Sequence, residues 1–135
     1  MMESLQVNGT EFTPLVIFDT KTSHFEISGE SRPENPGKFY EPFIKWLDQY
    51  QAELTAQKNA GTPSKIVFEF RLEYYNSISA KYILEILTVL DRFHSNGLDV
   101  SVKWKYDEQD TDMFESGEEF AKLMNVPIEL VSIPS

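Results

Sequence analysis

The sequence contains no cysteine among its 135 residues. This absence excludes disulfide bonds, thiolate catalysis and zinc sites built on cysteine. Glycine is also sparse, and its 6 copies form neither a G-x-G-x-x-G nor a G-x-x-x-x-G-K phosphate-binding pattern. The G-x-S-x-G turn that carries the nucleophile of many hydrolases does not occur either. Common nucleotide-binding and nucleophilic enzyme classes therefore lack their sequence motifs here.

Long apolar runs and basic charge are equally scarce. No apolar stretch approaches the roughly 18–20 residues of a membrane span. The start of the chain, "MMESLQVNGTEF", lacks the features of a signal peptide, so a cytoplasmic location is expected. A formal net charge of −10 argues against binding to nucleic acids or anionic membranes, because both select Lys/Arg-rich surfaces. The acidic surface instead favours basic protein partners.

The composition itself is that of a folded domain. Hydrophobic residues make up 41% of the chain and aromatic residues 13%, which argues against disorder. The length suits one domain with its own core, and no repeat or linker divides it. We therefore expect a single domain over residues 1–135.

The N-terminal half predicts three short strands and one helix. The strands are "LQV", "LVIFD" and "HFEIS", and the last two are expected to form a hairpin. The helix is assigned to the segment of residues 32–54, in which Asn35 is the expected cap and Pro36 the first helical position. The turn residues "NAGTP", residues 59–63, end this part of the chain. Pro42 predicts a kink or a helix that restarts near Glu41, because proline removes one helical hydrogen bond. The expected apolar stripe consists of Phe39, Phe43, Trp46, Leu47 and Tyr50.

Two later strands, "KIVFEFRLEY" and "DVSVKWKY", alternate between apolar and polar residues. In the first strand, one side carries Ile66, Phe68, Phe70, Leu72 and Tyr74, and the other carries Glu69, Arg71 and Glu73. Strands covered on both faces would read as continuous apolar runs. This alternation therefore predicts a sheet that is covered by helices on one face only.

Helices are expected between and after these two strands. "ISAKYILEILTVLDRFHSNG" is strongly apolar on one side and ends at Asn96-Gly97. A third helix runs from about Asp112 to Met124, and "IELVSI" forms a last strand. The apolar residues of this third helix are Phe114, Phe120, Leu123 and Met124. The predicted order is β-β-β-α-β-α-β-α-β, an α/β fold with one mixed sheet and parallel neighbours wherever one helix intervenes.

Catalytic constellations are poorly supported. His24 and His94 are far apart in the sequence, and no acid–His–nucleophile spacing accompanies them. The acidic stretch "DEQDTDMFESGEE" begins at Asp107 and places Glu118 twelfth, as a calcium loop requires. However, Asp112 stands where such a loop needs glycine. A metal-dependent enzyme that uses residues 107–112 is therefore the least favoured reading, and we expect no metal and no cofactor.

The stretch "YYNSISAK", residues 74–81, joins the central strand to the most apolar helix. Asn76, Ser77 and Ser79 are residue types that cap helices by accepting backbone N–H bonds. An exposed serine at this junction is also a site where phosphate fits, because a helix N-terminus favours negative charge. The residues alone favour a cap and leave phosphorylation as the alternative.

Three blocks of the chain, in this order and spacing, resemble the SiaC-like bacterial regulatory phosphoproteins. They are "GESRPENPGKFYEPFIKWLDQY", "FEFRLEYYNSISAKYILEIL" and "VKWKYDEQDTDMFESGEEFAKLMNVPIEL". The resemblance implies a fold similar to that of the STAS-type anti-sigma-factor antagonists. It also implies a non-enzymatic protein that a serine/threonine kinase phosphorylates and a PPM-type phosphatase dephosphorylates. In the best-known case the unmodified form activates a diguanylate cyclase, which raises cyclic di-GMP and favours biofilm growth.

The resemblance also assigns residues at the junction. The family's phosphoacceptor lies in an Asn-Thr-Ser-Ser stretch, in which Asn76 matches the Asn, Ser77 the acceptor Thr and Ser79 the last Ser. Ser77 is thus the expected phosphorylation site, with Ser79 as the alternate acceptor, and Asn76 and Ser79 as supporting cap residues. Ile78 replaces the middle Ser and is expected to pack inward. The competing hypothesis is a constitutive protein-binding module in which Ser77 only caps the helix.

Overall fold

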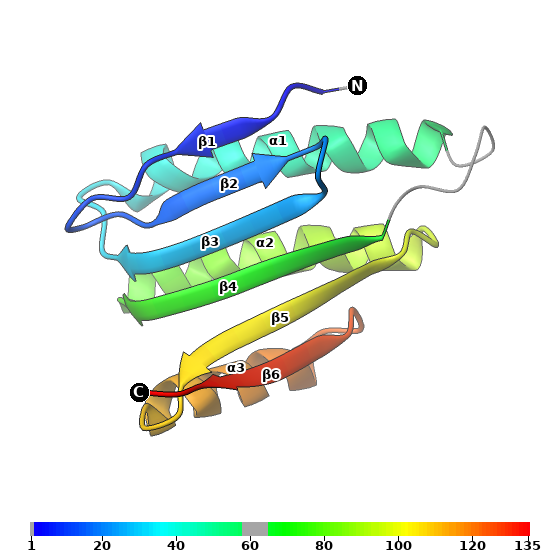
Figure 1. Cartoon of the computed structure of the whole chain (residues 1–135). Helices are drawn as coiled ribbons and strands as arrows, with labels where there is room; N and C mark the ends of the chain where they lie inside the picture. Colours follow the sequence, from blue (N-terminus) through cyan, green and yellow to red (C-terminus); the bar gives the residue numbers. More distant parts are fainter. Residues whose placement is uncertain (1, 58–64) are drawn as a thin grey trace.

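The chain forms one mixed sheet with three helices in the computed structural model, which describes residues 2–57 and 65–135 (Figure 1). The predicted helix end at residues 59–63 lies outside the described residues. The strands are β1 (Leu5–Val7), β2 (Leu15–Asp19), β3 (His24–Ser31), β4 (Ile66–Tyr75), β5 (Val100–Asp107) and β6 (Ile128–Ile133). The helices are α1 (Pro36–Gln57), α2 (Ser77–Ser95) and α3 (Thr111–Leu123). The predicted order of elements is confirmed.

The strands lie in the sheet in the order in which they occur in the chain, β1-β2-β3-β4-β5-β6. β1, β2 and β3 pair antiparallel, and β3 to β6 pair parallel. One helix separates each parallel pair along the chain, as a parallel crossover requires. The predicted hairpin and the predicted parallel neighbours are therefore both confirmed.

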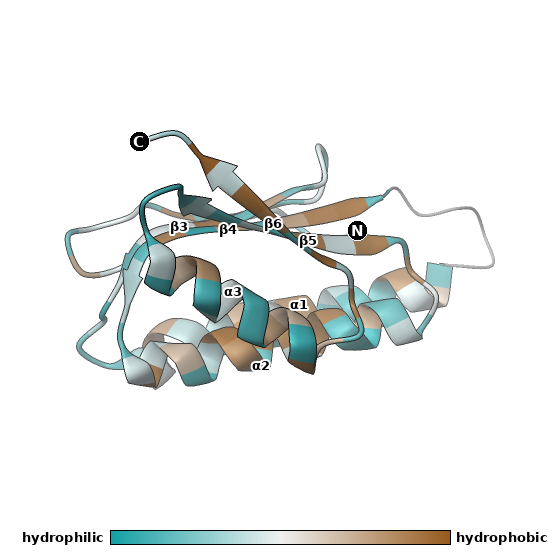
Figure 2. Ribbon diagram, turned by 90° about the horizontal axis from the view of Figure 1, so that it is seen from below, coloured by the Kyte–Doolittle hydropathy of each residue, from teal (hydrophilic) through white to brown (hydrophobic). Residues whose placement is uncertain are grey.

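All three helices cover the same face of the sheet (Figure 2). The inward-facing residues of β4 and β5, among them Phe68, Phe70 and Trp104, are almost fully buried beneath them. Glu69 and Lys105 lie on the opposite face, where they form an ion pair of 3.1 Å. The predicted one-sided layering is confirmed. Within the described residues, no helix is both long and apolar enough to cross a membrane.

α1 continues without interruption through Pro42, so the predicted restart near Glu41 is wrong. Pro42 lies on the exposed side of the helix, where water can reach the backbone carbonyl that proline leaves without its helical donor. The buried residues of α1 are Tyr40, Phe43, Leu47, Tyr50 and Leu54. Phe39, which we expected in this set, is only partly buried, and Tyr40 takes the inward position in the first turns.

β4 follows the predicted alternation as far as Leu72, but the prediction for Tyr74 is wrong. Gly29 of β3 pairs with Leu72, whereas the next residue, Glu30, pairs with Tyr74. Glu73 is therefore the extra residue of a β-bulge, and the side-chain alternation of β4 reverses beyond it. Tyr74 is 49% exposed as a result, while Tyr75 packs edge-on against Trp104 in the core.

α3 packs on the sheet through a glycine, which the apolar pattern did not indicate. Gly117 is buried against the Trp104 ring, and a Cβ at this position would lie 2.6 Å from a methyl group of Leu130. The indole N–H of Trp104 donates to the carbonyl of Met113 at 3.0 Å. Leu123, one of the apolar residues of this helix, is 65% exposed because it lies in the last turn of α3, on the side away from the sheet.

α2 ends as predicted, at Asn96-Gly97. Gly97 has a φ of +79°, a left-handed conformation that glycine adopts without strain. Its N–H donates to the carbonyl of His94, and the N–H of Leu98 donates to that of Phe93. This pair of bonds is a Schellman motif, which satisfies carbonyls that the helix end leaves without donors.

Candidate functional site at the junction of β4 and α2

The predicted site lies where β3 and β4 end side by side and α2 begins. Ser31, the last residue of β3, pairs with Tyr75, the last residue of β4. One residue later, the N–H of Asn76 donates to the carbonyl of Ser31 at 3.1 Å. The first turn of α2 is therefore fixed directly against the end of the neighbouring parallel strand.

Asn76 caps α2. Its backbone is extended, with φ −84° and ψ 172°, and its side-chain oxygen accepts from the N–H of Ser79 at 2.9 Å. The carbonyl of Asn76 accepts the first helical bond, from the N–H of Ala80 at 3.1 Å. This is the geometry of an N-cap residue, and it sets the direction in which α2 leaves the sheet.

Ser77 is the first residue of α2, and its side chain is exposed. Its hydroxyl makes no hydrogen bond with any residue in the described ranges, 2–57 and 65–135. The first turn of α2 contains no acidic residue, so the positive end of the helix dipole is not balanced there by a carboxylate. A phosphate on this hydroxyl would meet the free N–H groups and the dipole at the helix start.

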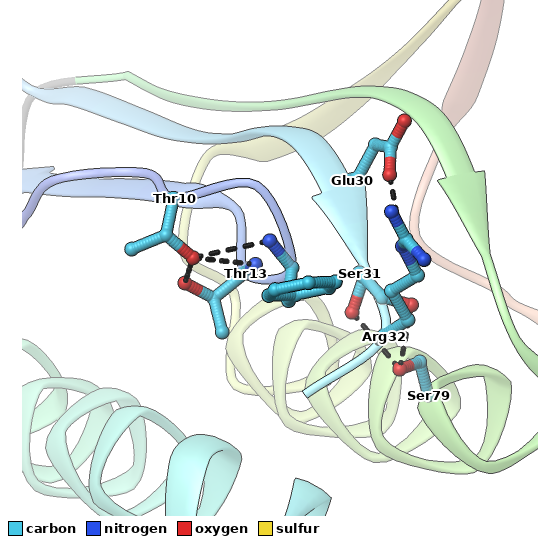
Figure 3. Close-up of polar contacts among 7 residues, drawn as sticks. Thr10, Thr13, Glu30, Ser31, Arg32 and Ser79 are labelled. Atoms are coloured by element: carbon cyan, nitrogen blue, oxygen red, sulfur yellow. Dashed lines mark hydrogen bonds and ion pairs between the residues drawn. The ribbon is translucent and has the colours of Figure 1, made fainter. Parts of the chain in front are cut away.

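Ser79, two residues further on, is fully buried and bonded to β3 (Figure 3). The Ser31 hydroxyl donates to the Ser79 hydroxyl at 2.9 Å, and the Ser79 hydroxyl donates to the Ser31 carbonyl at 3.1 Å. The Tyr40 hydroxyl completes this cluster by a short hydrogen bond to the Ser31 hydroxyl. Burial raises the pKa of Tyr40, although its bonds to the two serines oppose the shift. The three hydroxyls join β3, α1 and α2.

The prediction that Ile78 packs inward is wrong, because its side chain is 56% exposed. Successive helical residues are turned by about 100° around the axis, so only one residue of this turn faces the sheet directly. Ser79 occupies that position. Ile78 therefore presents an apolar side chain to solvent beside Ser77.

The loop between β1 and β2 closes the other side of the site. The N–H of Arg32 donates to the carbonyl of Phe12 at 2.8 Å, and the Arg32 guanidinium lies 4.7 Å from the centre of the Phe12 ring. Glu30 accepts from Arg32 at 3.0 Å (Figure 3). The Thr10 hydroxyl accepts from the N–H of Thr13 at 3.0 Å and holds the loop in its turn. Arg32 is thus fixed at the edge of the site by a carboxylate and an aromatic ring.

The acidic stretch at residues 107–112 has local structural roles. The Asp110 carboxylate caps α3 by accepting from the N–H of Met113 at 3.0 Å. The Asp107 carboxylate accepts from the Ser135 hydroxyl at 2.5 Å and from the N–H of Gln109 at 2.9 Å. These bonds, the one from Ser135 foremost, lower the pKa of Asp107. Both carboxylates therefore stabilise the turn and the start of α3.

A second group of titratable residues, on the outer face of the sheet, was not predicted. The side-chain nitrogen or oxygen atoms of His24, Glu26 and Glu69 that could coordinate a metal ion lie within 4.8 Å of one another. Glu26 accepts from Ser28 at 2.7 Å and lies 3.0 Å from His24, while Glu69 is paired with Lys105. The protein's own groups thus compensate these carboxylates. The alternation of β3 places His24 and Glu26 on one face, but only the register to β4 brings Glu69 to them.

A match to a family of known proteins covers almost the whole chain. Residues 7–133 match the family model described as SiaC family regulatory phosphoprotein. The chain belongs to the SiaC family. This membership agrees with the resemblance seen in the sequence, and the fold is that of SiaC structures.

The chain is similar to proteins from Pseudomonas aeruginosa. An uncharacterized protein of strain UCBPP-PA14 is 29% identical over 129 residues, which are 96% of each chain. The crystal structure of apo-SiaC has a TM-score of 0.80 at 25% identity and covers 96% of this chain and 99% of that chain. The crystal structure of the diguanylate cyclase SiaD in complex with its activator SiaC matches with a TM-score of 0.84 at 27% identity and the same coverage. SiaC of that bacterium is therefore a regulatory partner of a cyclase.

Proposed function

We propose that this protein is a cytoplasmic, non-enzymatic switch that acts as a single regulatory domain. In its unmodified form it binds and activates a diguanylate cyclase. A serine/threonine kinase phosphorylates Ser77, which weakens that binding, and a PPM-type phosphatase restores it. The cyclase class comes from the partner named for SiaC of Pseudomonas aeruginosa.

The contrast between two nearby serines carries the proposal. Ser77 is exposed at the positive end of α2, whereas Ser79 is fully buried and bonded to Ser31. A kinase must bring the acceptor hydroxyl into its own active site, which only the exposed serine allows in the folded protein. This contrast favours Ser77 over the alternate acceptor Ser79. Family membership as a regulatory phosphoprotein supports phosphorylation of this protein.

Intact-mass analysis after incubation with the kinase and ATP tests the modification. We expect one added phosphate on the wild-type protein and on Ser79→Ala, and none on Ser77→Ala. Phosphate that persists on Ser77→Ala would refute the assignment. The partner is tested by purifying the tagged Ser77→Ala variant from its own cells and identifying bound proteins by mass spectrometry. Recovery of a diguanylate cyclase is expected, and its absence would refute the partner class.

The second candidate is a constitutive binding module in which Ser77 only caps α2, and the observed cap geometry argues against that role. Asn76 already caps α2, so Ser77 is not needed for that role. A constitutive module predicts equal cyclase binding by Ser77→Ala and Ser77→Asp. The switch predicts that the Asp variant binds less tightly while both variants keep the wild-type circular dichroism spectrum. Equal affinities of the two folded variants would decide for the constitutive module.

A further inference from the structure

Exposed large apolar side chains gather at one end of the sheet, around Ser77. The described surface has four of them: Phe12 at 48% exposure, Tyr74 at 49%, Ile78 at 56% and Leu123 at 65%. Leu123 ends α3 at the opposite end of the sheet, close to the start of β6. The other three flank the ends of β3 and β4 and the start of α2. We call Phe12, Tyr74 and Ile78 the junction surface.

The fold turns Tyr74 outward by an irregularity of the sheet. Without the bulge at Glu73, Tyr74 would continue the inward series of Phe68, Phe70 and Leu72. Gly29, beside the bulge, has a φ of +107°, a conformation that residues with side chains rarely adopt. Bulges that re-aim a side chain are frequent near functional sites. Exposure of this aromatic ring is thus built into the backbone.

An ion pair and a cation–π contact connect Phe12 to the end of β3, next to Tyr74. Glu30 stands opposite Tyr74 in the sheet and pairs with Arg32, whose guanidinium lies over the Phe12 ring. Ile78 follows Ser77 directly and projects from the first turn of α2. Ser77 therefore lies between Tyr74 and Ile78 along the chain, at the end of the sheet where Arg32 packs over Phe12.

A hollow beside Tyr74 is acidic, which favours a partner with a basic side chain at this place. It encloses about 300 Å³ and contains the carboxylates of Glu73, Asp110 and Asp112, with no basic side chain among its lining residues. The protein as a whole carries a net charge of −10. A lysine or arginine of a partner would be attracted to this hollow, and opposite charges across an interface speed association and select partners.

We propose that the junction surface is the docking site for the partner cyclase. The cyclase presents an apolar side chain to Tyr74 and Ile78 and a basic side chain to the hollow that Glu73 lines. Phosphate on Ser77 would then put a hydrated dianion between apolar anchors, and the cost of desolvating it weakens the complex. This inference rests on the proposed function and adds the contact residues and the chemistry of the partner.

The test measures the Kd of the cyclase recovered with the Ser77→Ala variant, by calorimetry with purified proteins. Tyr74→Ala and Ile78→Ser should each weaken binding at least about tenfold, as truncation of interface anchors does. Leu123→Ala is the matched control, since it removes an equally exposed apolar side chain elsewhere, and it should change Kd by less than about twofold. Glu73→Gln should weaken binding and reduce its salt dependence, whereas Glu129→Gln on β6 should do neither.

The outcomes separate this inference from the function on which it rests. If the cyclase binds and the Tyr74 and Ile78 variants stay within about twofold of wild type, the docking site is wrong and the switch function stands. A loss with Leu123→Ala as large as that with Ile78→Ser would also overturn the site. If no cyclase is recovered, the partner class and the docking site are both wrong. Equal melting temperatures of all variants ensure that binding, and not folding, is compared.

Discussion

The chemistry of the site is decided by which serine faces the sheet. Ser77 and Ser79 are two residues apart, which turns their side chains by about 200° around the helix axis. One hydroxyl is therefore exposed and the other is enclosed by Ser31 and Tyr40. Two residues with the same chemistry thus have different roles: Ser77 is the proposed phosphate acceptor, and Ser79 is a structural link between α2 and β3.

Ser31 should contribute more to stability than either of its hydroxyl partners. It binds Tyr40 and Ser79 at once, so Ser31→Ala removes the acceptor of the Tyr40 hydroxyl and one of the two bonds of the Ser79 hydroxyl, which still donates to the backbone carbonyl at position 31. We expect a loss of about 1–3 kcal/mol for Ser31→Ala and about 1 kcal/mol for Tyr40→Phe. Urea unfolding followed by circular dichroism measures both. A larger loss with Tyr40→Phe than with Ser31→Ala would contradict the arrangement.

Gly117→Ala should destabilise the protein although alanine favours helices. The new methyl group would meet the Trp104 ring and Leu130, both of which pack against the core. Overpacking typically costs about 1–3 kcal/mol, and the helix gains about 1 kcal/mol from alanine, so a net loss of up to about 2 kcal/mol is expected. Urea unfolding and a changed tryptophan emission spectrum test this. Glu115→Ala, at an exposed position of the same helix, is the control and should cause no loss.

Single-residue details were the least predictable part of the site. Ser79 and Gly117 interrupt apolar patterns, and the sequence indicated Ser79 only as a cap residue or alternate phosphate acceptor and gave no role to Gly117. Their importance depends on contacts with Ser31 and Trp104, which are distant in the chain. Hydrophobic periodicity does not reveal such contacts, because it depends only on the spacing of apolar residues and not on which distant residues they touch.

At the scale of the element, the start of α2 lacks negative charge. A carboxylate in the first turn should stabilise the helix through its dipole, by about 0.3–1 kcal/mol. Ser77→Asp should therefore raise the melting temperature slightly. Asn76→Ala, which removes the cap, should cost about 1 kcal/mol. Thermal melts of both variants are the measurement, and a Ser77→Asp variant that melts lower than wild type would contradict this expectation.

β4 marks the point at which strand alternation stops being informative. The alternation placed Ile66 to Leu72 correctly because the pairing of β4 with β3 is uninterrupted from Val67 to Leu72. It misplaced Tyr74 because a bulge depends on both strands, and the glycine that accompanies it, Gly29, is more than forty residues away in the chain. For α1 the sequence predicted a helix restart that the structure does not show. Pro42 is tolerated within the helix because its missing hydrogen bond faces water.

For the whole molecule, stability should fall in alkaline solution. Burial raises the pKa of Tyr40, Tyr50 and Tyr75 above the ordinary value of 10.0. Above about pH 10 the unfolded chain loses tyrosine protons that the folded protein retains, so unfolding releases protons and becomes easier as pH rises. Below that pH these groups add no pH dependence. Urea midpoints at about pH 9 and about pH 11 measure the effect.

Tyr40→Phe is the matched variant for this prediction. It removes one of the buried tyrosines whose pKa is raised. The stability of this variant should therefore fall less steeply than that of the wild type as the pH rises above the ordinary tyrosine pKa. A wild-type urea midpoint that does not change up to about pH 11 would contradict the prediction.

The overall architecture was the most predictable level. One-sided alternation in β4 and β5 and single helices between strands already implied a mixed sheet with one covered face. Such patterns extend over eight to ten residues in these strands, so one exception does not obscure them. The sequence located the junction between β4 and α2. It did not show which hydroxyl faces inward, because that depends on the exact residue at which α2 begins.

The order of the strands also bears on how the protein is made. Each strand pairs with the one synthesised just before it, so the sheet can grow in one direction as the chain leaves the ribosome. The hydroxyl cluster of the junction consists of Ser31, Tyr40 and Ser79, all of which precede β5 in the chain. The first turn of α2, with Ser77, can therefore form against β3 while the last part of the protein is still being translated.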